Sequence, residues 1–323
     1  MLVLILLLIG IIGLILGAQL IIKGALNIAE HFKLSHIFIG LTILAIGTDL
    51  PELVIDINAA IHRLSGIETS SLIIGETVGT CMAQLALTLG IIGLFGTSLF
   101  LTKREIFREG SMLLGSVVLL FLLGFDGELS RLDGLIFVVI YGIYFVLLYG
   151  AEKAKELEVK RAPSLDKGWA ILSLIMGFGI LIFASTLVID NALELATTWG
   201  IKQSFVGAVI VGLGTSLPEI TISISALARK APRLSVGNLI GSNIFDVLFT
   251  LGVGSSISGF AVDKDLLFFD IPFLFITSVI VVILFLTNKK LTKKEAVILL
   301  VIYFIYLFSK ILSIENGVVE SFI

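Results

Sequence analysis

Two copies of a six-residue phrase place acidic side chains inside long apolar stretches. The first copy reads G-T-D-L-P-E at residues 47–52, and the second reads G-T-S-L-P-E at residues 214–219. A carboxylate at membrane depth is costly unless a cation, a proton, a polar partner or water neutralises it. Glu52 and Glu219 are therefore candidates for binding a cation or carrying a proton.

The residues around each acid can supply further oxygen ligands. The proline of each phrase lacks an amide hydrogen and so frees the carbonyl one turn earlier, near the glycine. Thr48 precedes Glu52 by four residues, and Thr215 stands in the same relation to Glu219. This spacing puts hydroxyl and carboxylate on one helical face. Oxygen ligands suit hard cations such as calcium and sodium, and the single cysteine, Cys81, excludes a cysteine metal cluster.

The elements that must hold these residues are transmembrane helices. Hydrophobic residues make up 57% of the 323-residue chain, and mean hydropathy is +1.12, which exceeds the usual apolar share of globular proteins. Segments of about 20 apolar residues can cross a bilayer. The sequence predicts an all-α membrane protein with ten transmembrane helices, at approximately 2–29, 37–62, 70–98, 108–125, 132–150, 168–193, 203–228, 234–259, 266–287 and 295–313.

The loops indicate how the chain is oriented. If the N-terminus is outside, sixteen lysines and arginines fall in inner loops and four in outer loops, as the cytoplasmic preference of basic residues requires. We therefore expect a multi-pass protein of the cell membrane with both termini outside. We expect the lipid bilayer and inorganic cations as partners, no nucleic acid, and a monomeric chain.

The second half of the chain repeats the first. A shift of 167 residues aligns the two phrases, and a shift of 162 aligns Gly75 with Gly237 and Thr80 with Ser242. Five spans, an odd number, separate the copies, so the second half must cross the membrane in the opposite direction. Inverted repeats are typical of alternating-access transporters with a site near the midplane. The expected divisions are a first five-helix repeat at 1–150, a charge-rich cytoplasmic linker at 151–167 and an inverted repeat at 168–323.

Two further helical faces carry oxygen-bearing side chains at the same four-residue spacing. Ser242 and Asp246 share one face, and Thr80 and Gln84 occupy the matching face in the first half. We expect the four faces to converge. The full set of candidate cation ligands is Thr48, Asp49, Glu52, Glu76, Thr80, Gln84, Thr215, Ser216, Glu219, Ser242 and Asp246.

Together with G-N-L-I-G-S-N-I-F-D at residues 237–246, the two phrases resemble the cation/calcium exchanger superfamily. The resemblance covers nearly the whole chain and is closest to prokaryotic sodium/calcium exchangers. It implies that Glu52 and Glu219 are the central calcium ligands. It also implies that further oxygens of the sodium and calcium sites come from Thr48, Thr215, Ser216, Ser242 and Asp246.

The first half departs from the family pattern by gaining charge. The family usually has serine at Asp49, asparagine at Glu76 and Gln84, and a small polar residue near Asp56. The four core segments hold six acids and no lysine or arginine, so several cations, protons or water must balance the charge. Asp56 and Glu76 fit either an external acidic vestibule or direct ion binding.

These features favour a secondary active antiporter that exchanges calcium for sodium, with the same carboxylates serving both ions in turn. The alternative is a calcium/proton antiporter, or an exchanger of another cation, using Asp49 and Glu76. A passive channel or receptor would not need two inverted copies of a charged site. An enzyme is disfavoured, because the three histidines fall at segment ends and no nucleophile with an attending base is present. We expect no cofactor.

Overall fold

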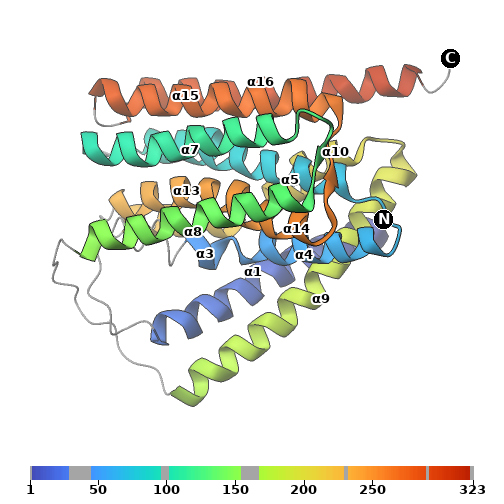
Figure 1. Ribbon diagram of the computed structural model, residues 1–323, viewed down its shortest axis with the longest axis horizontal. Helices are drawn as coiled ribbons and strands as arrows, with labels where there is room; N and C mark the ends of the chain where they lie inside the picture. The colour runs from blue at the N-terminus through green and yellow to red at the C-terminus, as the bar shows by residue number, and fades with distance from the viewer. Residues whose placement is uncertain are drawn as a thin grey trace.

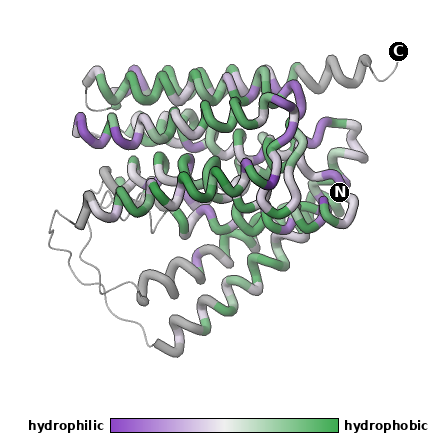
Figure 2. The backbone as a smooth tube through the Cα atoms, viewed as in Figure 1, coloured by the Kyte–Doolittle hydropathy of each residue, from purple (hydrophilic) through white to green (hydrophobic). Residues whose placement is uncertain are grey.

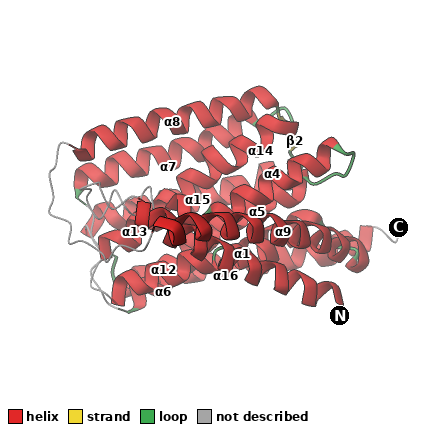
Figure 3. Cartoon of the chain, turned by 90° about the horizontal axis from the view of Figure 1, so that it is seen from below, coloured by secondary structure: helices red, strands yellow, loops and turns green. Residues whose placement is uncertain are grey.

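Helices account for almost all of the structure in the computed structural model, which describes residues 2–28, 45–95, 102–153, 167–228, 232–288 and 291–320. Most of the helices run side by side along the long axis of the molecule (Figures 1 and 3). Their bounds are α1 Leu2–Ile28, α3 Ala45–Thr48, α4 Leu50–Leu64, α5 Ser70–Met82, α6 Leu89–Leu94, α7 Lys103–Leu123, α8 Arg131–Lys153, α9 Lys167–Trp199, α10 Gln203–Phe205, α11 Gly212–Thr215, α12 Leu217–Ala228, α13 Pro232–Phe245, α14 Leu251–Ser258, α15 Ile271–Asn288 and α16 Lys293–Glu320.

Eight helical runs among the described residues are long and apolar enough to cross a membrane, and a shorter apolar helix covers Leu2–Gly17. Apolar residues extend along most of each run, while hydrophilic residues gather at the start of α7 and in loops (Figure 2). The predicted segment at 37–62 begins outside the described residues. Most of the predicted linker at 151–167 also lies outside them. The structure therefore supports a multi-spanning helical protein with eight candidate spans.

Four π-helical segments interrupt the longer helices, at η2 Ala83–Thr88, η3 Val206–Val211, η4 Asp246–Thr250 and η5 Leu266–Asp270. Such segments are frequent at functional sites in helical proteins. The segments η2 and η4 both follow directly on the glycine-rich helices α5 and α13, which the sequence repeat pairs. A two-stranded antiparallel pairing of β1 Glu128–Leu129 with β2 Phe260–Ala261 joins two of the loops, and the sequence did not predict it.

Helices α1 and α9 form an oblique pair at one side of the molecule (Figure 1). Small residues let the two helices approach closely. A Cβ atom added to Gly10 would lie 2.8 Å from Cγ2 of Val188, and one added to Gly13 would lie 2.8 Å from Cβ of Ala184. No larger side chain fits at this interface without a shift.

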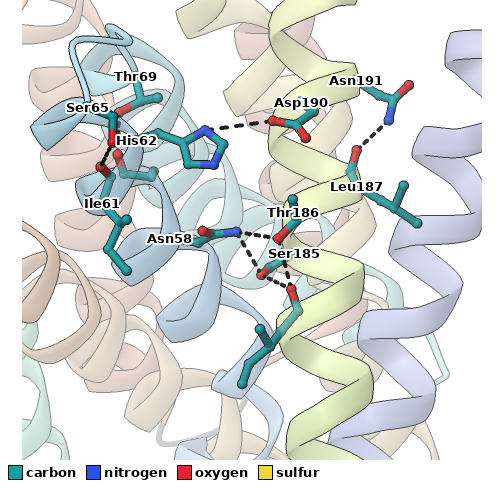
Figure 4. A network of polar contacts seen from close by, with 12 residues as sticks. Asn58, Ile61, His62, Ser65, Thr69, Ser185, Thr186, Leu187, Asp190 and Asn191 are labelled. Carbon is teal, nitrogen blue, oxygen red and sulfur yellow. Dashed lines mark hydrogen bonds and ion pairs between the residues drawn. The ribbon is translucent and has the colours of Figure 1, made fainter.

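Polar contacts connect this pair to α4 (Figure 4). The Asn58 amide donates to the hydroxyls of Thr186, at 2.9 Å, and Ser185, at 3.3 Å. One turn later, Nδ1 of His62 lies 3.7 Å from Oδ1 of Asp190. Asn58 follows Glu52 by six residues, which places the two on different faces of α4. Contacts to α9 on one face therefore help to fix the direction of the other face, which carries Glu52.

Two buried acids in the flanking helices are held by a tyrosine and a basic residue. Glu109 of α7 accepts from the Tyr144 hydroxyl and pairs with Arg108. Asp270, at the end of η5, accepts from the Tyr306 hydroxyl at 2.8 Å and pairs with Lys310 at 3.0 Å. These carboxylates are neutralised locally and join α7 to α8 and η5 to α16. The role of these two acids is therefore to stabilise the packing of the helices.

The Asp270 cluster gives a stability prediction. Lys310→Met should destabilise the protein by about 3–5 kcal/mol, because removing one partner of a buried ion pair leaves an uncompensated charge. Tyr306→Phe removes a single hydrogen bond and should cost only about 1 kcal/mol. Thermal unfolding of the purified protein in detergent measures the difference. Equal shifts in melting temperature for the two variants would contradict the pairing of Lys310 with Asp270.

Candidate cation site

Each of the two phrases interrupts a helix. Helix α3 ends at Thr48 and α4 begins at Leu50, with Asp49 in the break between them. In the second copy, α11 ends at Thr215 and α12 begins at Leu217, with Ser216 in the break. The proline that follows each break cannot donate a backbone hydrogen bond. The predicted loosening of the helix at both phrases is thus confirmed.

The second phrase is brought to α5 by an unusually close helix crossing. A Cβ atom added to Gly79 would lie 2.1 Å from the backbone oxygen of Ala208, and one added to Gly207 would lie 2.0 Å from that of Leu72. Both approaches are to backbone, so only glycine fits at these two positions. The crossing packs α5 directly against η3 and α11, which positions Glu76 beside Thr215.

Three carboxylates from the two phrases meet in the interior. Asp49, Glu52 and Glu219 each offer an oxygen that lies within 4.8 Å of those of the other two, and all three side chains are buried. Among the residues that the structure describes, none forms a hydrogen bond to any of their oxygens. Thr48 lies next to Glu219, so the first phrase contributes to the surroundings of the second acid. These groups form one oxygen-rich centre.

Glu76 is attached to the same centre through two threonines. Its Oε1 accepts from the hydroxyl of Thr215 at 3.2 Å and from that of Thr80 at 3.3 Å. Thr80 also lies 3.2 Å from the backbone oxygen of Gly212. The charge of Glu76 acts on Glu52. Glu76, which belongs to α5, therefore adds to the negative potential of the centre.

The last ligand candidates come from α13 with η4 and from η2. Ser242 and Asp246 are buried, and within the described ranges their side-chain oxygens have no hydrogen-bond partner. The charge of Asp246 acts on Asp49 and on Glu52. The oxygen of Gln84 behaves differently, because it accepts a 2.6 Å hydrogen bond from the amide of Asn243. Gln84 is therefore held by a neighbour that the sequence reasoning did not include.

All eleven predicted ligand residues are buried in the structure. The contacts given above join Asp49, Glu52 and Glu219 to one another and Glu76 to Thr80 and Thr215. Other buried polar groups are not among the predicted ligands. Asp56, one turn beyond Glu52, is fully buried with both oxygens lacking a donor partner. Unpartnered polar atoms also occur at Ser223, Ser235 and Asn238. The sequence repeat could have identified two of these residues, because Ser223 aligns with Asp56 and Asn238 aligns with Glu76.

The acids of this centre differ from buried acids elsewhere in the described chain. Glu109 and Asp270 have tyrosine and basic partners, and Glu105 joins a helix-capping box with Thr102. No comparable partner reaches the carboxylates of the centre, which are Asp49, Glu52, Asp56, Glu219 and Asp246. A buried charge without a partner is strongly unfavourable. Oxygen ligands of this kind are those that calcium and other hard cations prefer.

Comparison with known proteins gives the family. The family model described as "Sodium/calcium exchanger protein" matches residues 2–150 and 169–312. The sodium/calcium exchanger MaX1 of Methanosarcina acetivorans is 28% identical, over 85% of this chain and 89% of its own length. An uncharacterized membrane protein of Methanocaldococcus jannaschii is 31% identical, over 77% of this chain and 80% of its own length.

A solved structure supports the same assignment. The structure of the sodium-calcium exchanger NCX_Mj soaked with 2.5 mM Na⁺ and 0.1 mM Ca²⁺ superposes with a TM-score of 0.68 at 28% identity, covering 96% of this chain and 98% of that one. Its fold is therefore shared by this chain. The related proteins named by activity are exchangers, which are transporters rather than enzymes. The chain is a multi-pass membrane antiporter and belongs to the sodium/calcium exchanger protein family.

Proposed function

We propose that this protein exchanges calcium for sodium across the cell membrane by alternating access, with the buried carboxylates as the ion-binding groups. The observation that carries the proposal is a set of buried carboxylates, centred on Asp49, Glu52 and Glu219, that accept no hydrogen bond from the described part of the chain. Acids at membrane depth are functional by default, since keeping them there is expensive. Family membership supplies the pair of ions, sodium and calcium.

Each candidate ligand has a role in this proposal. Glu52 and Glu219 bind calcium directly, and the sodium ions use the same carboxylates when calcium has left. Because the two ions compete for the same oxygens, occupancy by one excludes the other and couples their movements. The remaining ligand positions supply hydroxyl, amide or additional carboxylate oxygens from Thr48, Asp49, Glu76, Thr80, Gln84, Thr215, Ser216, Ser242 and Asp246.

The proposed architecture has ten transmembrane helices in two inverted repeats, 1–150 and 168–323, joined by a cytoplasmic linker at 151–167. Both termini face outward, and the chain acts as a monomer. Paired features of the two halves support the repeat. Helix breaks occur at Asp49 and Ser216, π-helical segments follow α5 and α13, and tyrosine–carboxylate pairs occur at Tyr144 and Tyr306. A site between inverted repeats can open to either side in turn.

Asp49 supports a second candidate, the exchange of calcium for protons. The matching position in the second phrase is the neutral Ser216, and the Asp49 side chain is fully buried beside Glu52 and Glu219. A carboxylate added to a cation site can carry a proton in place of a cation. The two candidates differ in the ion whose gradient drives calcium movement.

Calcium flux into proteoliposomes separates the two candidates. We expect an imposed sodium gradient to drive calcium uptake by the wild-type protein and by Asp49→Ser, which installs the residue of the second phrase. An imposed pH gradient without sodium should drive none. Uptake driven by pH alone, and lost in Asp49→Ser, would instead establish proton coupling and contradict the sodium proposal.

A further inference from the structure

Asn243, near the end of α13, contacts a predicted ligand and is not itself among the predicted ligands. Its amide nitrogen donates to Oε1 of Gln84 at 2.6 Å and to the backbone oxygen of Leu239 at 2.7 Å. The side chains of Asn243 and Gln84 are both fully buried. The first of these hydrogen bonds therefore joins the second half of the chain to a candidate ligand of the first half.

The two hydrogen bonds fix the orientation of both amides. A backbone carbonyl can only accept a hydrogen bond, so the atom of Asn243 that contacts Leu239 must be its nitrogen. The same nitrogen contacts Gln84, so the Gln84 atom that it meets must be the oxygen. Oδ1 of Asn243 and Nε2 of Gln84 are left outside these contacts, and neither has a hydrogen-bond partner among the described residues.

The positions of the two amides along their helices place them with other ligand candidates. Asn243 precedes Asp246 by three residues, a spacing that makes them neighbours on one helical face. Gln84 follows Thr80 by four residues, and the Thr80 hydroxyl lies 3.4 Å from that of Thr215 in the second phrase. The hydrogen bond between Gln84 and Asn243 is thus a direct contact between two of the faces that the sequence predicts to converge.

The chemistry of the unpartnered Asn243 oxygen suits a hard cation. Burying an amide oxygen without a partner is unfavourable, and calcium accepts side-chain amide oxygens as ligands alongside carboxylates. In the sequence repeat, Asn243 aligns with Cys81, and sulfur ligands select softer metals. The first half therefore has no amide oxygen at the equivalent position, and Asn243 supplies one from the second half alone.

We propose that Oδ1 of Asn243 is a further calcium ligand, and that Gln84 is a positioning residue that holds the Asn243 amide in its ligating orientation. Because the nitrogen of Asn243 is bonded to both Gln84 and Leu239, its oxygen cannot exchange places with the nitrogen without breaking two hydrogen bonds. The inference rests on the proposed function, since it adds one oxygen to the same ion-binding centre.

Equilibrium dialysis with radioactive calcium in sodium-free buffer tests the ligand on the full-length protein in detergent. Asn243→Leu keeps the approximate size of the side chain and removes its oxygen, so the Kd for calcium should rise about 10-fold. Asn191→Leu is the matched control, because Asn191 of α9 also donates to the carbonyl four residues earlier, at 2.7 Å (Figure 4). This control should keep the wild-type Kd. A symmetrical elution profile in size-exclusion chromatography establishes that each variant is folded.

A double substitution tests the positioning role of Gln84. Gln84→Met removes the acceptor for the Asn243 amide and should raise the Kd for calcium. Adding Gln84→Met to Asn243→Leu should raise the Kd by a smaller factor than Gln84→Met does alone, because the amide that Gln84 holds is already absent. Equal factors in the two backgrounds would show that Gln84 does not act through Asn243.

The outcomes distinguish this inference from the proposed function. A wild-type Kd in Asn243→Leu, or an equal rise in Asn191→Leu, overturns the Asn243 ligand. Sodium-driven calcium flux can persist in either case, which leaves the exchanger proposal intact. A raised Kd confined to Asn243→Leu, in a protein without sodium-driven flux, would support the ligand and contradict the sodium-coupled function. A wild-type protein that binds no calcium would overturn both.

Discussion

Either Glu219→Gln or Glu52→Gln is expected to abolish sodium-driven calcium transport. Each carboxylate is buried, has no hydrogen-bond donor among the described residues, and offers an oxygen within 4.8 Å of the other two members of the central trio. Glutamine keeps the shape but removes the charge that the ion balances. Removing one partner of a buried charge pair costs about 3–5 kcal/mol, so we expect calcium uptake into proteoliposomes to fall by at least about 100-fold at subsaturating calcium.

The same chemical change on the surface provides the control. Glu128 is exposed at the start of β1, between α7 and α8, so Glu128→Gln should transport calcium at the wild-type rate. Size-exclusion profiles and protein orientation in the vesicles must match among all three variants. Wild-type transport by Glu52→Gln or Glu219→Gln would show that these acids do not bind the transported ion, and the proposed function would be wrong.

Alanine at Gly79 is expected to prevent correct packing of the helices around the site. The added Cβ atom would lie 2.1 Å from the backbone oxygen of Ala208 and 2.4 Å from its Cα atom. Backbone cannot rotate away as a side chain can, so α5 and η3 must separate. Overpacking in well-filled interiors costs about 1–3 kcal/mol and sometimes more. We expect a strong loss of folded protein, or a melting temperature lower by roughly 10 °C.

Glycines at open positions allow a matched comparison for the helix crossing. Added Cβ atoms at Gly115 of α7 and Gly142 of α8 would have no other atoms within 4 Å. Alanine at either position should leave the yield unchanged, and its better helix propensity should stabilise the helix slightly. Fluorescence-detected size-exclusion chromatography of the three variants measures folded yield. If Gly79→Ala is as stable as Gly142→Ala, the close approach of α5 and η3 is not present in the protein.

Much of the helical framework follows from local properties of the sequence. The apolar runs predicted at 203–228, 234–259 and 266–287 agree closely with helical structure at 203–228, 232–258 and 266–288. The interruptions at Asp49 and Ser216 were also predictable, because a proline two residues later removes a backbone donor whatever the tertiary context.

Some of the residues of the candidate site were predictable from the sequence. Glu52 and Glu219 stand out because acids inside apolar segments are rare and costly. The four-residue spacings then identify the residues on the same helical face. Spacing along a single helix does not determine which side chains from different helices meet. For the same reason, the sequence does not decide whether Asp56 lines a vestibule or binds an ion.

Tertiary structure decided which carboxylates have partners. Glu109 and Asp270 obtain a tyrosine from a neighbouring helix, and the residues of each pair lie more than thirty positions apart in the sequence, so no local pattern links them. Asp56 is enclosed and unpartnered because α14 packs over it. The sequence by itself determined the membrane-spanning helices, their breaks and the acids they carry. Only helix packing could decide which acids have partners among the described residues and which do not, since this depends on contacts between distant segments.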